Sequence, residues 1–140
     1  MFLANERVCN KQFIMKKILL FSGLVLGLMS FTAQGDVDAI VNAFKAADAG
    51  QVGSHFDDYV DMKLLDKDEV KNIGRNQATL TLKAFFAENG IKGFEKTSER
   101  EIGATMYLAG KLLDNGKGHN ITIMLKLKDG KRQIITLRIS

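Results

Sequence analysis

The pattern of apolar and polar positions is clearest in the C-terminal third of the chain, where it repeats every two residues. Between residues 120 and 128 one side of the pattern is apolar, and it consists of Ile121, Ile123, Leu125 and Leu127. The alternation returns in residues 134–139, where one side consists of Ile135, Leu137 and Ile139. Because successive side chains of a strand point to opposite faces, both segments are predicted to be strands with one buried face.

Turn-forming residues separate these two segments from each other and from a third apolar segment. An Asp129-Gly130 pair lies between the two strands, and this pair favours the tight turn of a β-hairpin. Upstream, the apolar run from Thr105 to Leu113 is followed by a glycine-rich loop at residues 114–118. The three segments therefore predict an antiparallel meander, and such a sheet needs other elements to cover its apolar face.

The preceding residues can supply that cover, because their apolar positions follow a helical period. Asp36 can cap a helix whose buried stripe would be Val37, Ile40, Val41, Phe44 and Ala47. A second helix is predicted over residues 76–89, with Ala78, Leu82, Phe85 and Phe86 on one side and a capping glycine at position 90. A short helical turn at 51–56, a strand at 59–65 and an exposed or edge strand at 93–101 complete the predicted order.

Residues 15–35 have the pattern of a bacterial export signal. Met15-Lys16-Lys17 is followed by an apolar run at 18–29 and by small residues up to Gly35, which predicts cleavage before Asp36. The apolar run is shorter than the roughly 20 residues needed to span a bilayer. We therefore expect an upstream extension at 1–14, a signal peptide at 15–35 and one domain at 36–140. The domain is expected to be periplasmic or secreted, without a stable membrane anchor after cleavage. Its mature form would lack Cys9, the only cysteine of the chain.

Charge is distributed unevenly along the chain. The formal net charge is +4, but residues before Asp36 contribute +3 of it (four bases, one acid). Residues 36–72 contain nine acids and four bases (−5), whereas residues 73–140 contain six acids and twelve bases (+6). The overall charge is therefore no argument for nucleic-acid binding, and an exported protein would not meet nucleic acid. The two halves of the domain are expected to attract each other or to present faces of opposite sign.

The order of elements resembles the NTF2-like, or cystatin-like, α+β fold. The chain from Met15 is also similar to the small exported bacterial proteins of the DUF4783 family. The segments that carry this resemblance are Asp36–Phe44, His55–Met62, Ala84–Asn89, Ile102–Leu113 and Ile134–Ile139. The resemblance implies a cone in which a curved antiparallel sheet of about four to five strands packs on N-terminal helices. It implies no catalytic residues, because it rests on apolar positions and an Asp-Asp pair.

The sequence shows no catalytic constellation, and the domain is predicted not to be an enzyme. His55 beside Asp57 and Asp58 could be a base with an orienting carboxylate, but at a helix end such residues more often cap or stay solvated. Tyr107 is the best candidate for a polar group inside the cone, although a single tyrosine is more often a core or rim residue. His119 lies in a hairpin loop without a partner nearby in sequence. No ligand spacing for zinc or calcium and no phosphate-loop or dinucleotide motif is present, so neither metal nor cofactor is expected.

Three functions remain open at this stage. The first is a non-catalytic domain that binds a small apolar or amphipathic ligand in the cone or serves as an interaction module. Its candidate pocket residues are Phe44, Met62, Phe85, Phe86, Tyr107, Ile123 and Leu125. The second is a small enzyme of the isomerase or dehydratase type, with a polar residue inside the cone. The third is a homodimer through the sheet, with a mixed patch formed by Thr122, Met124, Ile134 and Thr136.

Basic residues of the meander are expected on or near its solvent side. They are Lys111, Lys126, Lys128, Lys131, Arg132 and Arg138. They could be a solvated face in which lysines protect the sheet from edge pairing, or a surface that docks an anionic partner. An acidic polysaccharide, a lipid headgroup and the acidic half of a second copy are the partners that fit such a surface.

Overall fold

The computed structural model describes residues 32–140 of the chain, with side chains from residue 35 onward. The predicted upstream extension, Cys9 and the apolar part of the predicted signal peptide lie outside the described residues. The predicted cleavage position before Asp36 lies inside the first described helix, α2 (Thr32–Lys45). No helix within residues 32–140 is long and apolar enough to cross a membrane.

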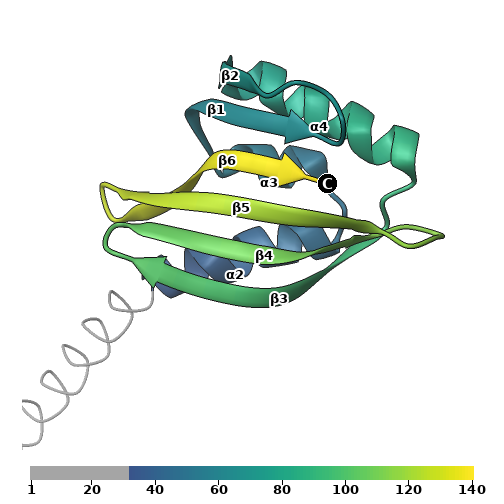
Figure 1. The fold of residues 1–140 in the computed structure, drawn as a ribbon. Coiled ribbons are helices and arrows are strands. Elements are labelled where there is room, and N and C mark those ends of the chain that lie inside the picture. The colour runs from purple at the N-terminus through teal and green to yellow at the C-terminus, as the bar shows by residue number, and fades with distance from the viewer. Residues whose placement is uncertain (1–31) are drawn as a thin grey trace, which may run out of the picture. The chain divides into compact units, whose positions relative to one another are not determined.

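Three helices and six strands follow one another in an order close to the predicted one (Figure 1). After α2 come α3 (Ala49–Ser54), β1 (Phe56–Leu64), β2 (Val70–Gly74), α4 (Arg75–Asn89), β3 (Gly93–Ile102), β4 (Thr105–Leu113), β5 (His119–Lys128) and β6 (Lys131–Ile139). Between the predicted strand at 59–65 and the predicted helix at 76–89, where no element was expected, the structure has the short strand β2. The α+β fold is therefore confirmed, and the sheet has more strands than the expected four to five.

The six strands form one curved sheet in the order β2-β1-β6-β5-β4-β3 (Figure 1). Neighbouring strands from β3 to β6 are antiparallel, which confirms the meander. β1 pairs with β6 in parallel, so the sheet is mixed and not purely antiparallel as expected. β6 thus lies between the meander and the β1-β2 pair, and β2 and β3 are the two edges of the sheet.

One side of the sheet is covered by the helices, and its side chains form the core. Four residues of the predicted stripe of α2 are buried, and Ile40 and Phe44 are fully inaccessible to solvent. The fifth, Ala47, lies beyond the end of the helix and is only partly buried. From α4, the buried residues are Ala78, Leu82, Phe85 and Phe86. Gly90 ends this helix in the predicted left-handed conformation, with φ of 61°. We call the helix-covered side the covered face and the other side the open face. Figure 1 is seen from the open face, with α2 and α3 behind the strands and α4 beside β1 and β2.

A bulge in β6 changes which of its residues are buried. Met124 pairs with Thr136 but Leu125 pairs with Ile134, so Ile135 has no partner on β5. An extra residue of this kind reverses the alternation on one side of the bulge. Ile134 is therefore fully buried and Ile135 only partly so, which makes the predicted buried position of Ile135 wrong. Leu127, also predicted to be buried, is 38% exposed close to the end of β5.

Ion pairs join the acidic and basic halves of the domain, as expected from their charges. Asp57 on β1 lies 3.6 Å from Lys128 on β5. Glu69, just before β2, contacts Arg138 on β6 at 3.1 Å. Asp58 pairs with Arg75 at the start of α4, at 3.0 Å. Because most of these groups are partly exposed, each pair contributes modestly to stability, on the order of 0.2–1 kcal/mol.

Candidate functional site

The residues predicted to line a ligand pocket come together in the structure, but as parts of the core. Phe44, Ile123 and Leu125 are fully buried, and Met62 is 2% exposed. The ring of Phe44 lies 6.5 Å from that of Phe86 and 5.4 Å from that of Phe94. Because the fully buried side chains have no accessible surface, there is no space beside them that is large enough for a water molecule. A ligand bound among these side chains would therefore have to displace part of the core.

Tyr107 does not belong to this group. It alternates along β4 with the buried residues Met106 and Leu108, and it pairs with Arg100 on one side and Met124 on the other. Its side chain therefore lies on the open face, where it is partly exposed. The prediction that Tyr107 is the polar group inside the cone is wrong. Both sides of β4 carry apolar residues, so the sequence pattern did not distinguish the buried side from the open one.

The polar group that the structure places on the covered face is Arg132. It pairs with Leu127 on the same face and is 6% exposed, so its predicted position on the solvent side is wrong. Its Nη2 donates to Oε1 of Glu101 at 2.6 Å, and its backbone N–H donates to Oδ2 of Asp36 at 3.2 Å. Its Nη1 has no hydrogen-bond partner. A guanidinium stays protonated, so Arg132 is no general acid or base.

The two histidines do not form a catalytic group with the carboxylates proposed from the sequence. Asp57 and Asp58, beside His55, are engaged by Lys128 and Arg75. Burial lowers the pKa of His55, and the nearby charge of Asp36 opposes this shift. His55 therefore tends to be neutral, and its backbone carbonyl accepts a hydrogen bond from Ile134 that ties it to the sheet.

His119 has a partner that sequence reasoning missed. Its Nε2 lies 3.4 Å from Oδ2 of Asp114, at the other end of the β4-β5 loop. The other carboxylate oxygen of Asp114 accepts hydrogen bonds from the backbone of Gly116 and Gly118. The Gly116 hydrogen bond is the main cause that lowers the pKa of Asp114, with further contributions from Gly118 and His119. The pair thus shapes the loop, which is the common role of an aspartate bonded to amides two residues on.

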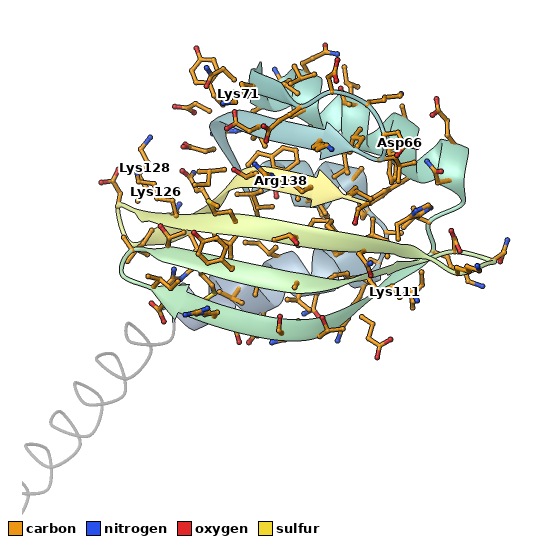
Figure 2. All side chains as sticks on the ribbon, in the orientation of Figure 1. Asp66, Lys71, Lys111, Lys126, Lys128 and Arg138 are labelled. Carbon is orange, nitrogen blue, oxygen red and sulfur yellow. The ribbon has the colours of Figure 1, made fainter. Side chains whose placement is uncertain are left out.

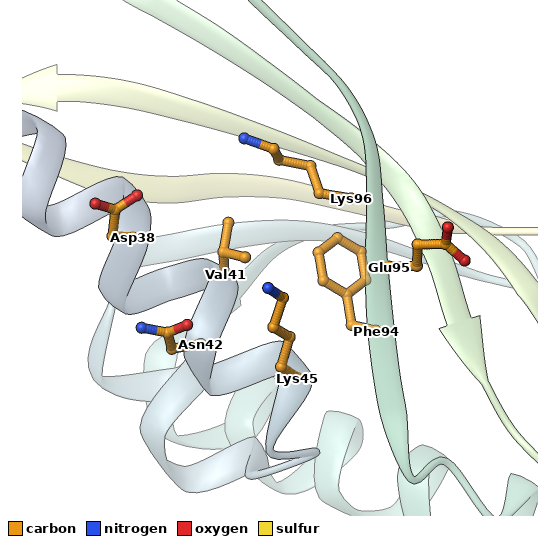
Figure 3. Close-up of a pocket in the computed structure, with 7 residues that line it drawn as sticks. All are labelled: Asp38, Val41, Asn42, Lys45, Phe94, Glu95 and Lys96. Carbon is orange, nitrogen blue, oxygen red and sulfur yellow. The ribbon is translucent and has the colours of Figure 1, made fainter.

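The described cavities lie on the surface and not inside the cone. A groove of about 500 Å³ between α2 and β3 is shown in Figure 3. Val41 and Phe94 form its apolar part, and charged groups of both signs surround it: Asp38, Lys45 and Lys96. Glu95 also lines the groove, but its side chain points away from it (Figure 3). Other cavities, of about 610 and 410 Å³, follow α3 and α4 and share the exposed Leu80. Within residues 32–140 no group of three or more His, Cys, Asp and Glu side chains could hold a metal ion.

The open face differs from these grooves because it is broad and rich in bases (Figure 2). A row of paired residues crosses five strands: Arg100, Tyr107, Met124, Thr136 and Asp61. We call this row the central row. Toward one end of the strands it is followed by Lys111, Arg138 and Lys63, and toward the other by Lys126, Lys128 and Lys131. Figure 2 shows Lys111 and the pair Lys126 and Lys128 at opposite ends of the sheet, with Arg138 between them.

Within the described part of the chain, most bases of the open face form no ion pair, although Lys111 lies opposite Glu95 in the β3-β4 ladder. Lys128 and Arg138 are paired with Asp57 and Glu69. No ion pair within residues 32–140 involves Lys63, Arg100, Lys111, Lys126 or Lys131. Lys128 and Lys131 even lie opposite each other in the β5-β6 hairpin, which places like charges side by side.

Comparison with known proteins agrees with this fold. The family model described as "Domain of unknown function (DUF4783)" matches residues 37–140. The chain belongs to this family. A DUF4783 protein of Bacteroides ovatus is 20% identical, with a TM-score of 0.67 over 72% of this chain and 90% of that one. Another, from Bacteroides fragilis, is 24% identical, with a TM-score of 0.64 over 72% and 93%.

The wider fold class is shown by more distant structures. An uncharacterised cystatin-fold protein of Novosphingobium aromaticivorans is 13% identical, with a TM-score of 0.57 over 76% of this chain and 95% of that one. The DUF4783 chain therefore has an NTF2-like, cystatin-like fold, as the sequence resemblance implied. No curated protein matches the chain. These comparisons carry no function, so function has to be argued from the surfaces described above.

Proposed function

We propose that this DUF4783 chain is an exported, non-catalytic interaction domain that binds an anionic partner through the open face of its sheet. The observation that carries the proposal is the group of bases on this face without acidic partners: Lys63, Arg100, Lys111, Lys126 and Lys131. Such a surface attracts anions and raises their local concentration.

Protection against edge pairing does not account for these lysines. That role applies to strands at the border of a sheet, where unpaired backbone groups are open to another chain. Here the borders are β2 and β3, whereas Lys111, Lys126 and Lys131 lie on β4, β5 and β6. These three strands are paired on both sides. The charge of these lysines therefore affects molecules that approach the open face. It does not protect the edges of the sheet.

The three other functions considered from the sequence have less support. Small-ligand binding in the cone conflicts with the closed packing of Phe44, Ile123 and Leu125. An enzyme needs an acid or base inside the cone, and the inward polar group is an arginine. A homodimer through the open face would bring basic rows together, because bases outnumber the acids Asp57, Asp61, Glu69 and Glu95 there. Like-charge contacts of this kind disfavour association.

The test measures binding of the exported, purified protein to three anionic probes: polyphosphate, polygalacturonate and phosphatidylglycerol vesicles. A triple variant, Lys111→Gln, Lys126→Gln and Lys131→Gln, removes three bases of the open face. The control triple variant, Lys45→Gln, Lys67→Gln and Lys83→Gln, removes the same charge elsewhere. We expect the open-face variant to lose about tenfold in affinity for at least one probe, and the control less than about threefold.

Salt provides an independent check of this mechanism. Because the charges are exposed, binding should weaken strongly between about 0.05 and 0.3 M NaCl. If none of the three probes binds, or if both triple variants lose affinity equally, the proposed function is wrong. Circular dichroism of each variant verifies that the fold is retained.

A further inference from the structure

We infer, resting on the proposed function, that the anionic partner is an acidic polysaccharide whose sugar rings lie against the tyrosines of the open face while its carboxylates contact the flanking bases. The inference goes beyond charge, because it specifies a partner with both flat apolar surfaces and regularly spaced acids. Three features of the open face support it: the position of the tyrosines, the geometry of the central row and the wide separation of the exposed aliphatic side chains.

Both tyrosines of the chain lie on the open face. Tyr59 is 64% exposed and alternates on β1 with the buried Val60, and Tyr107 lies in the central row. The described phenylalanines, in contrast, are all buried in the core: Phe44, Phe56, Phe85, Phe86 and Phe94. A tyrosine offers a flat apolar ring with a hydroxyl that can stay in water. Aromatic rings of this type suit a partner that has an apolar side and polar edges, as a sugar ring does.

The central row has the form of a track across the strands. It runs over five neighbouring strands from Arg100 on β3 to Asp61 on β1. Four inter-strand spacings give it a length of about 19 Å. Lys126 lies two residues beyond Met124 on β5, about 7 Å to one side, and Arg138 lies two residues beyond Thr136 on β6, on the other side. A linear anion lying along the row would have bases on both flanks.

The same face is poorly suited to a membrane surface. Interfacial binding relies on apolar side chains that enter the headgroup region, usually Trp, Phe or Leu. The chain has no tryptophan. Met124 and Ile135 near the middle of the open face are only partly exposed, and the exposed Ile102 and Leu113 lie apart from each other, at the ends of β3 and β4. Asp57, Asp61 and Glu95 also lie on this face and would be pressed against a continuous negative surface. A narrow polymer on the central row meets only Asp61, at the end of the row, whereas a flat bilayer would meet all three acids.

The experiment compares Tyr59→Ala and Tyr107→Ala in binding to polygalacturonate, to polyphosphate and to phosphatidylglycerol vesicles. Polyphosphate carries charge without sugar rings, so its binding measures the contribution of the bases alone. Neutral dextran has sugar rings without charge, so its binding measures the contribution of the ring contacts alone. We expect each tyrosine variant to weaken polygalacturonate binding by about threefold to tenfold and to leave polyphosphate binding unchanged. Tyr59→Phe should bind polygalacturonate nearly as well as the original protein, because the ring is kept.

Leu80→Ala serves as the matched control, since Leu80 is an exposed hydrophobic residue on α4, with 60% exposure. It should change no binding. Thermal unfolding of Tyr107→Ala shows whether that variant is folded, and the more exposed Tyr59 tests the inference independently of it.

Different failures separate the inference from the proposed function. Stronger binding to vesicles or to polyphosphate than to polygalacturonate, or binding that ignores both tyrosines, would overturn the inference and leave the anion-binding function in place. If the original protein binds none of the three anionic probes, both the inference and the proposed function are wrong.

Discussion

The two faces of the sheet are built from the same strands, but they differ in packing and in charge. On β5, Ile121, Ile123 and Leu125 are at most 1% exposed, whereas Lys126 between Leu125 and Leu127 is exposed to solvent. The covered face is close-packed, so its side chains are selected for volume and shape. The open face keeps like charges opposite each other, which stability alone disfavours. The comparison teaches that one two-residue alternation can specify both the packed core on one face and a charged surface on the other.

The largest expected effect comes from opening the core on the covered face. Leu125→Ala should lower the free energy of unfolding by about 2–5 kcal/mol, because it removes buried methyl groups and leaves a cavity. Met124→Ala, one residue away on the open face, is the matched control and should cost less than half as much. Urea unfolding followed by circular dichroism measures both. Equal losses would contradict the assignment of the two faces.

A smaller loss is expected from adding a methyl group to the covered face. Gly110 on β4 is buried, and a Cβ there would overlap the carbonyl oxygen of Glu95 and the ring of Phe94. Gly110→Ala should therefore cost about 1–3 kcal/mol through overpacking. Gly74→Ala is the control, because its Cβ would meet nothing within 4 Å and its φ is −61°. A near-neutral Gly110→Ala in urea unfolding would show that β3 and β4 can separate easily.

On the open face a substitution should stabilise the protein. Lys131→Glu would place an acid opposite Lys128 in the β5-β6 hairpin. Replacing a like-charge pair by an opposite pair should raise the free energy of unfolding by roughly 0.2–1 kcal/mol at low salt. The same variant should bind anionic probes more weakly, so stability and binding would change in opposite directions. The gain should shrink in high salt; a gain that is independent of salt would exclude the electrostatic explanation.

The smallest effect is a pH dependence from His55, where the chain leaves α3 for β1. Burial lowers its folded-state pKa below 6.5, although Asp36 opposes the shift. The unfolded chain then binds more protons than the folded one as pH falls through 6.5, so this histidine makes stability decrease toward acid pH. His55→Gln should flatten the stability profile just below pH 6.5 and leave it unchanged at neutral pH. NMR titration of His55 measures the pKa directly, and a value above 6.5 would reverse the sign.

Much of the fold was predictable because local pattern and tertiary packing agree. The stripe of α2, the glycine cap of α4 and the three-strand meander all follow from spacing and turn residues. The bulge at Ile135 was not predictable, since an inserted residue leaves no mark in an apolar stretch. The parallel pairing of β1 with β6 was also missed, because it joins segments that are distant in sequence and no local signal encodes such a contact.

The candidate surface was predicted in part. The sequence named Lys111, Lys126, Lys131 and Arg138 as bases of the meander, and the register places them on the open face. Arg132 was assigned to the same face, but the residue opposite it is Leu127 on the covered side. Tyr107 was assigned to the cone for a related reason: β4 has apolar residues in both phases of its alternation. Such a strand requires its neighbours to define which side is buried.

The position of β6 within the sheet determines when the domain can fold. Without its last strand the sheet would fall into two separate pieces, β2-β1 and β5-β4-β3. Contacts such as Ile134 with the backbone of His55 can form only when β6 is present. The domain is therefore expected to remain incomplete until β6 has been made, and its folding should be slow because it depends on pairing between distant segments. A late-closing architecture of this kind leaves the earlier strands without a complete sheet for most of the time that the domain is being made.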